Sequence, residues 1–111
     1  CTNPDLIVHR GTKEELCAGS VAEVFKSLGG DVVYFGKPYK EVYDLCLKKN
    51  EKTLVIGDNL NTDIKGANLL NYDCMIITNG IHKDEIKKDG IEKVSKNYEV
   101  LVNFMQSDLK W

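Results

Sequence analysis

The chain alternates between short apolar runs and longer segments in which apolar residues recur at helical spacing. Runs rich in β-branched and aromatic residues predict buried strands, and they lie at residues 31–36, 53–56 and 73–78. The helical spacing predicts helices at residues 19–28, from Pro38 to about residue 49, and at residues 64–70. Strands and helices are therefore expected to alternate along most of the chain.

The remaining segments carry weaker patterns. Residues 6–16 are interpreted as a connection with a turn at Gly11, and Gly29-Gly30 as the end of the first helix. From Lys83 onward, charged segments with sparse apolar anchors predict further helices, the anchors being Ile86, Ile91 and Val94. Residues 98–105 fit either a strand or a helix. The apolar spacing favours a final helix, through Leu101, Phe104, Met105 and Leu109.

Alternating strands and helices are typical of βα units, so the predicted fold class is α/β, a Rossmann-like parallel sheet with helices on both faces. Right-handed crossovers place the carboxyl ends of all parallel strands at one edge of the sheet. That edge is where open α/β sheets bind their ligands. We expect three segments to meet there: Gly36-Lys37, Gly57-Asp58 and Thr78-Asn79-Gly80.

Two aspartates follow the strand at 53–56 within one tight loop, Gly57-Asp58-Asn59-Leu60-Asn61-Thr62-Asp63. Two nearby carboxylates suit a hard divalent cation such as Mg²⁺. Asp58 directly follows a buried strand, where an unpaired charge would be costly, so we interpret it as a metal ligand. Asp63 is either a support of the same metal site or only the cap of the following helix.

Lys37 and Asn59 are the candidate phosphate-binding residues. Lys37 would bring a compact positive charge to phosphate oxygens at the same edge as Asp58, and Asn59 lies in the turn between the two aspartates. A Gly-Lys-Pro turn can also be simple chain punctuation, so the argument for Lys37 depends on its sharing an edge with Asp58. His9 and His82 are interpreted as surface residues.

Composition excludes several other classes of function. The 111 residues have a formal net charge of −2 with basic and acidic residues interspersed, so nucleic acid and anionic membranes are not expected as partners. The length fits one domain, and no apolar run approaches membrane-spanning length. The four cysteines are widely spaced, which argues against zinc and fits a reducing cytoplasm. Of these, Cys46 and Cys74 lie in apolar runs and are expected to be buried.

Two segments of the chain resemble motifs of a known family. Gly57–Ile64 resembles the fourth motif of the haloacid dehalogenase (HAD) superfamily of phosphatases, and Gly36-Lys37-Pro38 resembles the third. Residues 2–5 and 78–80 are similar to class IIA, the subclass with a large α/β cap between its second and third motifs. That subclass includes nucleotide, sugar-phosphate and nitrophenyl phosphatases.

This resemblance implies an activity and roles for the candidate residues. The parent protein would hydrolyse a small phosphorylated metabolite through a phosphoaspartate. Asp58 would be the Mg²⁺ ligand, Asp63 the support of the metal site, and Lys37 the catalytic partner of the phosphate and the nucleophile.

The chain departs from the family pattern in one respect. Family members attack phosphorus with the first aspartate of an Asp-x-Asp motif, and the second aspartate acts as general acid and base. No Asp-x-Asp occurs in this sequence. We therefore interpret residues 1–111 as the C-terminal part of a HAD-like core domain, without nucleophile or cap and inactive by itself. A half-core would expose apolar surface, which makes self-association a further hypothesis.

Two other interpretations compete with this one. A receiver-like regulatory module, in which a strand-end aspartate accepts a phosphoryl group, is the alternative that stays open. Against it, Lys37 precedes the aspartate strand, and no acidic pair precedes Lys37. A nucleotide-binding Rossmann half would need a Gly-x-Gly-x-x-Gly turn, which the sequence lacks.

Overall fold

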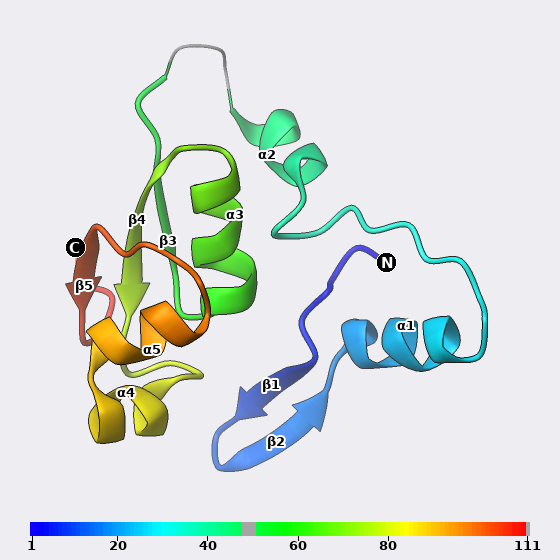
Figure 1. Cartoon of the computed structure of the whole chain (residues 1–111), viewed down its shortest axis with the longest axis horizontal. Helices are drawn as coiled ribbons and strands as arrows, with labels where there is room; N and C mark the ends of the chain where they lie inside the picture. Colours follow the sequence, from blue (N-terminus) through cyan, green and yellow to red (C-terminus); the bar gives the residue numbers. More distant parts are fainter. Residues whose placement is uncertain (48–50, 111) are drawn as a thin grey trace. The chain divides into compact units, whose positions relative to one another are not determined.

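The computed structural model describes residues 1–47 and 51–110. The chain divides into two compact units, Cys1–Lys48 and Lys49–Trp111. Figure 1 labels the helices and strands of both units. Each unit is considered by itself below.

The first unit contains an antiparallel hairpin near its start. Strands β1 (Ile7–Arg10) and β2 (Lys13–Leu16) pair across a turn at Gly11, whose φ of +65° is a conformation that glycine adopts readily. The predicted turn at Gly11 is confirmed, but the interpretation of residues 6–16 as a plain connection was wrong. Both strands are short, largely exposed and rich in charge, so no apolar alternation marked them.

Helix α1 (Ala18–Ser27) follows the hairpin and confirms the first predicted helix. Its end is also confirmed, because Gly29 takes a φ of +88° directly after the last turn. The first turn of the helix is tied to the segment before β1: the Ser20 hydroxyl donates to the Leu6 carbonyl at 2.6 Å. Gly19 is buried there, and a Cβ at that position would overlap the carbonyls of Pro4 and Asp5.

The predicted strand at residues 31–36 is not formed. Residues 33–35 are tied to Cys1 by two hydrogen bonds: the amino terminus donates to the Val33 carbonyl at 2.7 Å, and Phe35 N–H donates to the Cys1 carbonyl at 2.9 Å. A strand needs a longer ladder of such hydrogen bonds. Among the described residues, no segment pairs with residues 31–36 over a longer stretch.

Helix α2 (Lys40–Cys46) confirms a helix after Pro38 but begins later than predicted and has no buried residue. Cys46 is exposed, so its predicted burial was wrong. The helix also ends earlier than predicted, because Leu47 already has extended backbone with φ −108° and ψ 137°; the rest of the predicted extension, to Lys49, lies outside the described residues.

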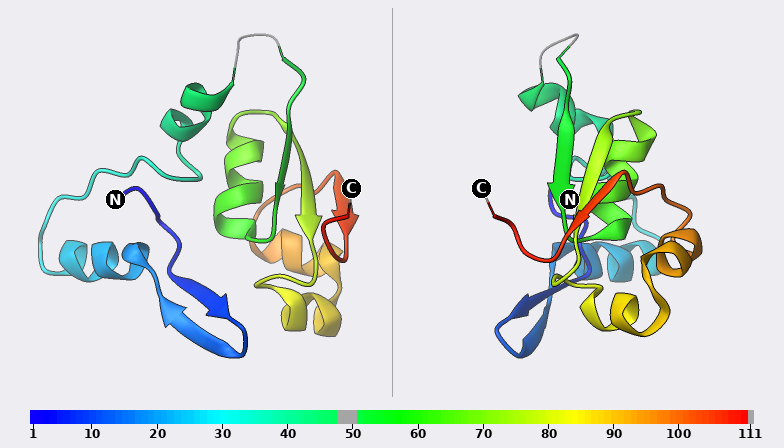
Figure 2. Two further views of the ribbon diagram at one scale, coloured as in Figure 1. Left: turned by 180° about the vertical axis from the view of Figure 1, so that it is seen from behind. Right: turned by 90° about the vertical axis from the view of Figure 1, so that its left-hand side faces the viewer.

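The second unit is built on a three-stranded parallel sheet with the order β3-β4-β5. Its strands are β3 (Leu54–Gly57), β4 (Asp73–Ile77) and β5 (Phe104–Gln106). The predicted strands at 53–56 and 73–78 are thus confirmed to within a residue, as is the α/β class with a parallel sheet. Figure 2 shows the three strands side by side from behind.

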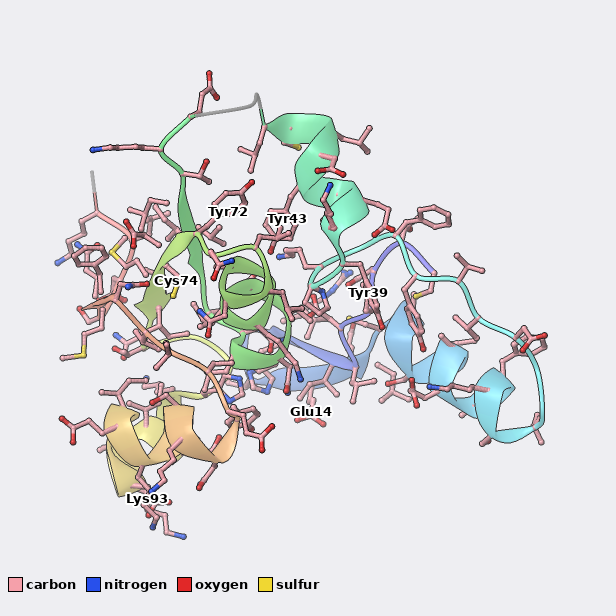
Figure 3. The ribbon with its side chains drawn as sticks, turned by 45° about the horizontal axis from the view of Figure 1, so that its top comes forward. Glu14, Tyr39, Tyr43, Tyr72, Cys74 and Lys93 are labelled. Carbon is pink, nitrogen blue, oxygen red and sulfur yellow. The ribbon has the colours of Figure 1, made fainter. Side chains whose placement is uncertain are left out.

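The core of this unit gathers on one face of the sheet. Cys74 and Ile76 alternate with more exposed neighbours on β4 and are fully buried. They pack with Leu60, Ile64, Ala67, Val94 and Val100. These residues come from the segment after β3, from helices α3 (Lys65–Leu69) and α5 (Ile91–Asn97), and from the turn after α5. The predicted burial of Cys74 is confirmed, and Figure 3 labels this residue on β4.

The charged segments after residue 83 form two short helices, as predicted. Val94 of α5 is fully buried, and Ile86 of helix α4 (Lys83–Asp89) and Ile91 of α5 pack against the core. All three predicted anchors are therefore confirmed. No helix in the described part of the chain is long and apolar enough to cross a membrane.

The predicted final helix is wrong, because the tail forms β5 instead. Two asparagines pin this segment beside β4. Asn68 exchanges two hydrogen bonds with the backbone of Leu101, at 2.6 and 3.0 Å, and Asn103 Oδ1 accepts the Cys74 N–H at 2.9 Å. Leu101 and Met105 are 78% and 64% exposed, so the apolar spacing in the tail did not mark a buried helical face.

Candidate functional site

The carboxyl ends of β3, β4 and β5 surround an open cleft of about 290 Å³. Its lining is drawn from all three strand ends and consists of Ile56, Gly57, Asp58, Ile77, Asn79, Gly80, Asp108 and Leu109. Because the strands run parallel, these residues share one edge of the sheet. The predicted meeting of Gly57-Asp58 with Asn79-Gly80 is therefore confirmed.

Asp58 stands at the mouth of this cleft and is exposed. Its Oδ2 accepts the Ile81 N–H at 3.1 Å, which ties the end of β3 to the segment that follows β4. Gly80 makes this approach possible, because a Cβ there would overlap the Asp58 carboxylate. The carboxylate thus faces solvent while the backbone fixes its direction.

Asp63 lies in a different environment although it is only five residues away. It is 5% exposed, and its Oδ2 accepts the N–H groups of Asp58 at 3.2 Å and Asn59 at 3.1 Å. A Cβ at Gly57 would overlap the Asp63 carboxyl group, so glycine is needed at the end of β3. Asp63 therefore holds the backbone of the loop that carries Asp58.

The loop itself becomes helical earlier than predicted. A π-helical turn, η1 (Leu60–Ile64), precedes α3, so the helix expected at residues 64–70 begins earlier with a wide turn. Asn59 stands before η1, and its side-chain oxygen accepts the Asn61 N–H at 2.9 Å. This bond gives Asn59 a role in the turn, and its predicted contact with phosphate stays a prediction.

Lys37 belongs to the first unit, whereas Asp58, Asn59 and Asp63 belong to the second. The predicted pairing of Lys37 with Asp58 therefore stays a prediction.

Two residues of this region were missed or misjudged from the sequence. Asp108, after β5, lines the cleft and accepts a hydrogen bond from Asn79 Nδ2 at 3.1 Å. That bond, followed by one from Ser107, lowers the pKa of the Asp108 carboxyl from its usual value. Asp108 was overlooked because the tail was expected to be a helix.

The interpretation of His82 as a surface residue was wrong. The residue is 9% exposed, and its Nε2 accepts the Leu60 N–H at 3.2 Å. A lone histidine in a polar turn gave no sign of burial, whereas His9 is exposed as predicted.

The donor set at the cleft fits part of a magnesium site. Asp58 offers a carboxylate oxygen of the kind Mg²⁺ prefers, and Mg²⁺ commonly combines one or two carboxylates with water and substrate oxygens. Within residues 1–47 and 51–110, no three His, Cys, Asp or Glu side chains gather closely enough to hold a metal ion. The described residues thus bring two carboxylates to the cleft, Asp58 and Asp108, and a buried one, Asp63, that shapes the loop.

Comparison with known families identifies the chain. The HAD-hydrolase-like family matches residues 34–103. The chain belongs to this family. The resemblance to its class IIA members, noted above from residues 2–5 and 78–80, is confirmed by the solved structures to which the chain is similar. A search of curated proteins found no match.

Three solved structures illustrate the similarity. A hydrolase of the haloacid dehalogenase-like family from Brucella suis is 36% identical with a TM-score of 0.67, and the match covers 72% of this chain and 33% of that one. A glycerol phosphate phosphatase from Mycobacterium tuberculosis, determined in complex with calcium, is 27% identical (TM-score 0.59; 71% and 24% covered). A p-nitrophenyl phosphatase from Archaeoglobus fulgidus shares the fold at 16% identity (TM-score 0.70; 96% and 41% covered).

The chain spans well under half the length of each of these structures.

Proposed function

We propose that this chain forms part of the core of a divalent-metal-dependent phosphatase that acts on a small phosphorylated metabolite. One observation carries the proposal: the Asp58 carboxylate stands at the carboxyl edge of a parallel sheet, fixed by the Ile81 N–H beside an open cleft. Membership of the HAD-hydrolase-like family supports a hydrolytic role for this edge. The phosphatases among the similar structures favour a phosphoester as the substrate.

Each candidate residue has a distinct proposed task. Asp58 binds Mg²⁺ directly, and Asp63 keeps the loop wound so that Asp58 faces the cleft. Lys37 and Asn59 contact the phosphoryl oxygens, where positive charge and hydrogen-bond donors stabilise the negative charge of the transition state. When bound, the metal ion would supply charge neutralisation at the same oxygens. A similar phosphatase was determined in complex with calcium, which supports a divalent cation as the cofactor.

The attacking aspartate is proposed to come from another part of the parent protein, because the 111 residues contain no Asp-x-Asp pair. We expect negligible hydrolysis of p-nitrophenyl phosphate by this chain with Mg²⁺, since removing a nucleophile eliminates most of the rate enhancement. Turnover within the usual enzyme range of roughly 1–10³ s⁻¹ would show that the chain holds a nucleophile of its own.

Metal binding is tested by titrating Mg²⁺ into the wild-type chain and into Asp58→Asn, followed by amide NMR shifts. The dissociation constant should rise at least about tenfold in the variant, because the charged ligand is lost. Asp73→Asn is the matched control: Asp73 is an exposed aspartate at the opposite, amino end of β4. Equal affinities for the wild type and Asp58→Asn would contradict the proposed metal site.

A further inference from the structure

His82 occupies an unusual position next to the candidate site. It stands just before α4, at the position of an N-terminal cap, yet its side chain makes no capping hydrogen bond to that helix. The ring is instead buried, and its Nε2 accepts the N–H of Leu60, a fully buried residue that begins η1. The histidine therefore contacts the loop between Asp58 and Asp63.

The hydrogen bonds define the protonation of the His82 ring. A backbone N–H can only donate, so Nε2 must be the unprotonated acceptor and the neutral ring carries its proton on Nδ1. Nδ1 lies 3.2 Å from Glu85 Oε2, so the Nδ1–H group can donate a hydrogen bond to that carboxylate oxygen. Both ring nitrogens then have a partner suited to one tautomer.

Tyr98 of the neighbouring turn completes this arrangement. Its hydroxyl donates to the same Glu85 oxygen at 3.2 Å, and its ring packs edge-on against His82 with centroids 4.8 Å apart. Burial, followed by the nearby Glu85 carboxylate, raises the pKa of the Tyr98 hydroxyl, which keeps it protonated as a donor. Glu85 and Tyr98 thus fix both the tautomer and the direction of the imidazole.

Two consecutive residues after β4 hold both parts of the candidate metal loop. Ile81 N–H donates to the Asp58 carboxylate, and His82 accepts from the Leu60 backbone two residues further along the loop. Asp63 fixes the same loop from within, through the N–H groups of Asp58 and Asn59. The loop is therefore held from its own sequence and from the segment after β4.

We propose that His82 is a positioning residue for the metal-binding loop: its Nε2 holds the Leu60 N–H so that Asp58 is presented to the cleft in a fixed orientation. The assignment of a metal to this loop rests on the proposed function, whereas the hydrogen bond itself does not.

Two substitutions in the 111-residue chain separate the hydrogen bond from ring packing. His82→Phe keeps an aromatic ring but cannot accept the Leu60 N–H, whereas His82→Gln places an amide oxygen near the Nε2 position. Hydrogen exchange of the Leu60 amide should be about tenfold faster in His82→Phe, as expected for the loss of an ordinary hydrogen bond. Exchange should return toward the wild-type rate in His82→Gln. His9→Phe, at the exposed histidine, is the control and should leave Leu60 unchanged.

Mg²⁺ titration of the same variants tests the functional part. The dissociation constant should rise about tenfold in His82→Phe, an effect typical of losing an outer-shell partner, and recover in His82→Gln. Faster Leu60 exchange with unchanged Mg²⁺ affinity would overturn the positioning role. Unchanged Leu60 exchange in His82→Phe would overturn the proposal entirely. A wild-type chain that does not bind Mg²⁺ would instead overturn the proposed function, and Leu60 exchange would still decide whether His82 holds the loop.

The wild-type chain provides an independent test if His82→Phe fails to fold. Nitrogen-15 NMR of the imidazole at neutral pH should show a protonated Nδ1 and an unprotonated Nε2. The opposite tautomer would exclude the hydrogen bond to Leu60 and overturn the proposal.

Discussion

Helix α5 of the second unit carries Val94 at 0% exposure, whereas helix α1 of the first unit carries Val24 at 60%. The contrast extends to both units as a whole. The described buried hydrophobic residues lie in the second unit except for Ala22. Helix α1 and its C-cap expose Val21, Val24, Phe25 and Leu28 at 54% or more. Because burial of apolar surface is the main stabilising contribution to folding, the second unit supplies most of the described core.

The difference between these units also bears on the candidate site. Asp58 and Asp63 lie on the unit with the core, and two core residues anchor their loop: Leu60 between the two aspartates and Ile64 directly after Asp63. The exposed apolar side chains of α1 are the kind of surface on which the predicted self-association depends, and self-association stays a prediction.

The largest expected effect comes from a matched pair of substitutions in the two helices. Val94→Ala should destabilise the chain by about 2–3 kcal/mol, because it removes buried methyl groups and leaves a cavity. Val24→Ala should change the free energy of unfolding by less than about 0.5 kcal/mol, as at other exposed positions. Urea denaturation followed by circular dichroism measures both. Equal losses would show that the apolar face of α1 is covered in solution.

A smaller effect separates the two aspartates of the loop. Asp63→Asn should cost about 1–2 kcal/mol, because the buried charged acceptor of two N–H groups is replaced by a neutral amide. Asp58→Asn should cost less than about 0.5 kcal/mol, since Asp58 is exposed. Urea midpoints of the two variants provide the comparison. A larger loss in Asp58→Asn than in Asp63→Asn would contradict the assigned roles.

The smallest effect concerns one tyrosine in each unit. Burial raises the pKa of Tyr98 from its ordinary value of 10.0, and an exposed hydrogen bond with Glu23 raises the pKa of Tyr34. A raised pKa in the folded state stabilises the protein below the unfolded value, and this contribution is lost as pH rises through the folded pKa. Wild-type stability should therefore fall as pH rises above 10.0.

This loss should be smaller in Tyr98→Phe, which removes the titrating hydroxyl. Tyr34→Phe should have the weaker influence, because solvent screens the exposed pair. Urea denaturation midpoints are measured from about pH 8 to about pH 11, a range that spans the ordinary tyrosine pKa. They test whether the loss of stability with pH is reduced more in Tyr98→Phe than in Tyr34→Phe. A steeper loss in Tyr98→Phe than in the wild type would contradict it.

Local signals in the sequence were enough to predict several elements. The β-branched runs identified β3 and β4, because a buried parallel strand is apolar along its length. Glycines marked the ends of β1 and α1, where a positive φ is required. The position of Asp58 at the sheet edge followed from the parallel connection alone.

Tertiary contacts decided the elements that local signals could not. The tail became β5 because Asn68 binds the tail's backbone at Leu101 and the Asn103 side chain accepts the Cys74 N–H of β4, both across more than 25 residues of sequence. Residues 31–36 had strand propensity, but among the described residues no strand pairs with them. Propensity alone was therefore insufficient to form a strand.

The candidate site divides in the same way. The sequence by itself determined that a carboxylate would follow β3 at the binding edge, because strand pattern and chain direction fix that position. Only the tertiary structure decided that Asp63 is buried against its own loop, that Asp108 lines the cleft, and that His82 accepts the Leu60 N–H. These roles depend on residues that are distant in sequence or on backbone amides, and neither leaves a pattern in the order of side chains.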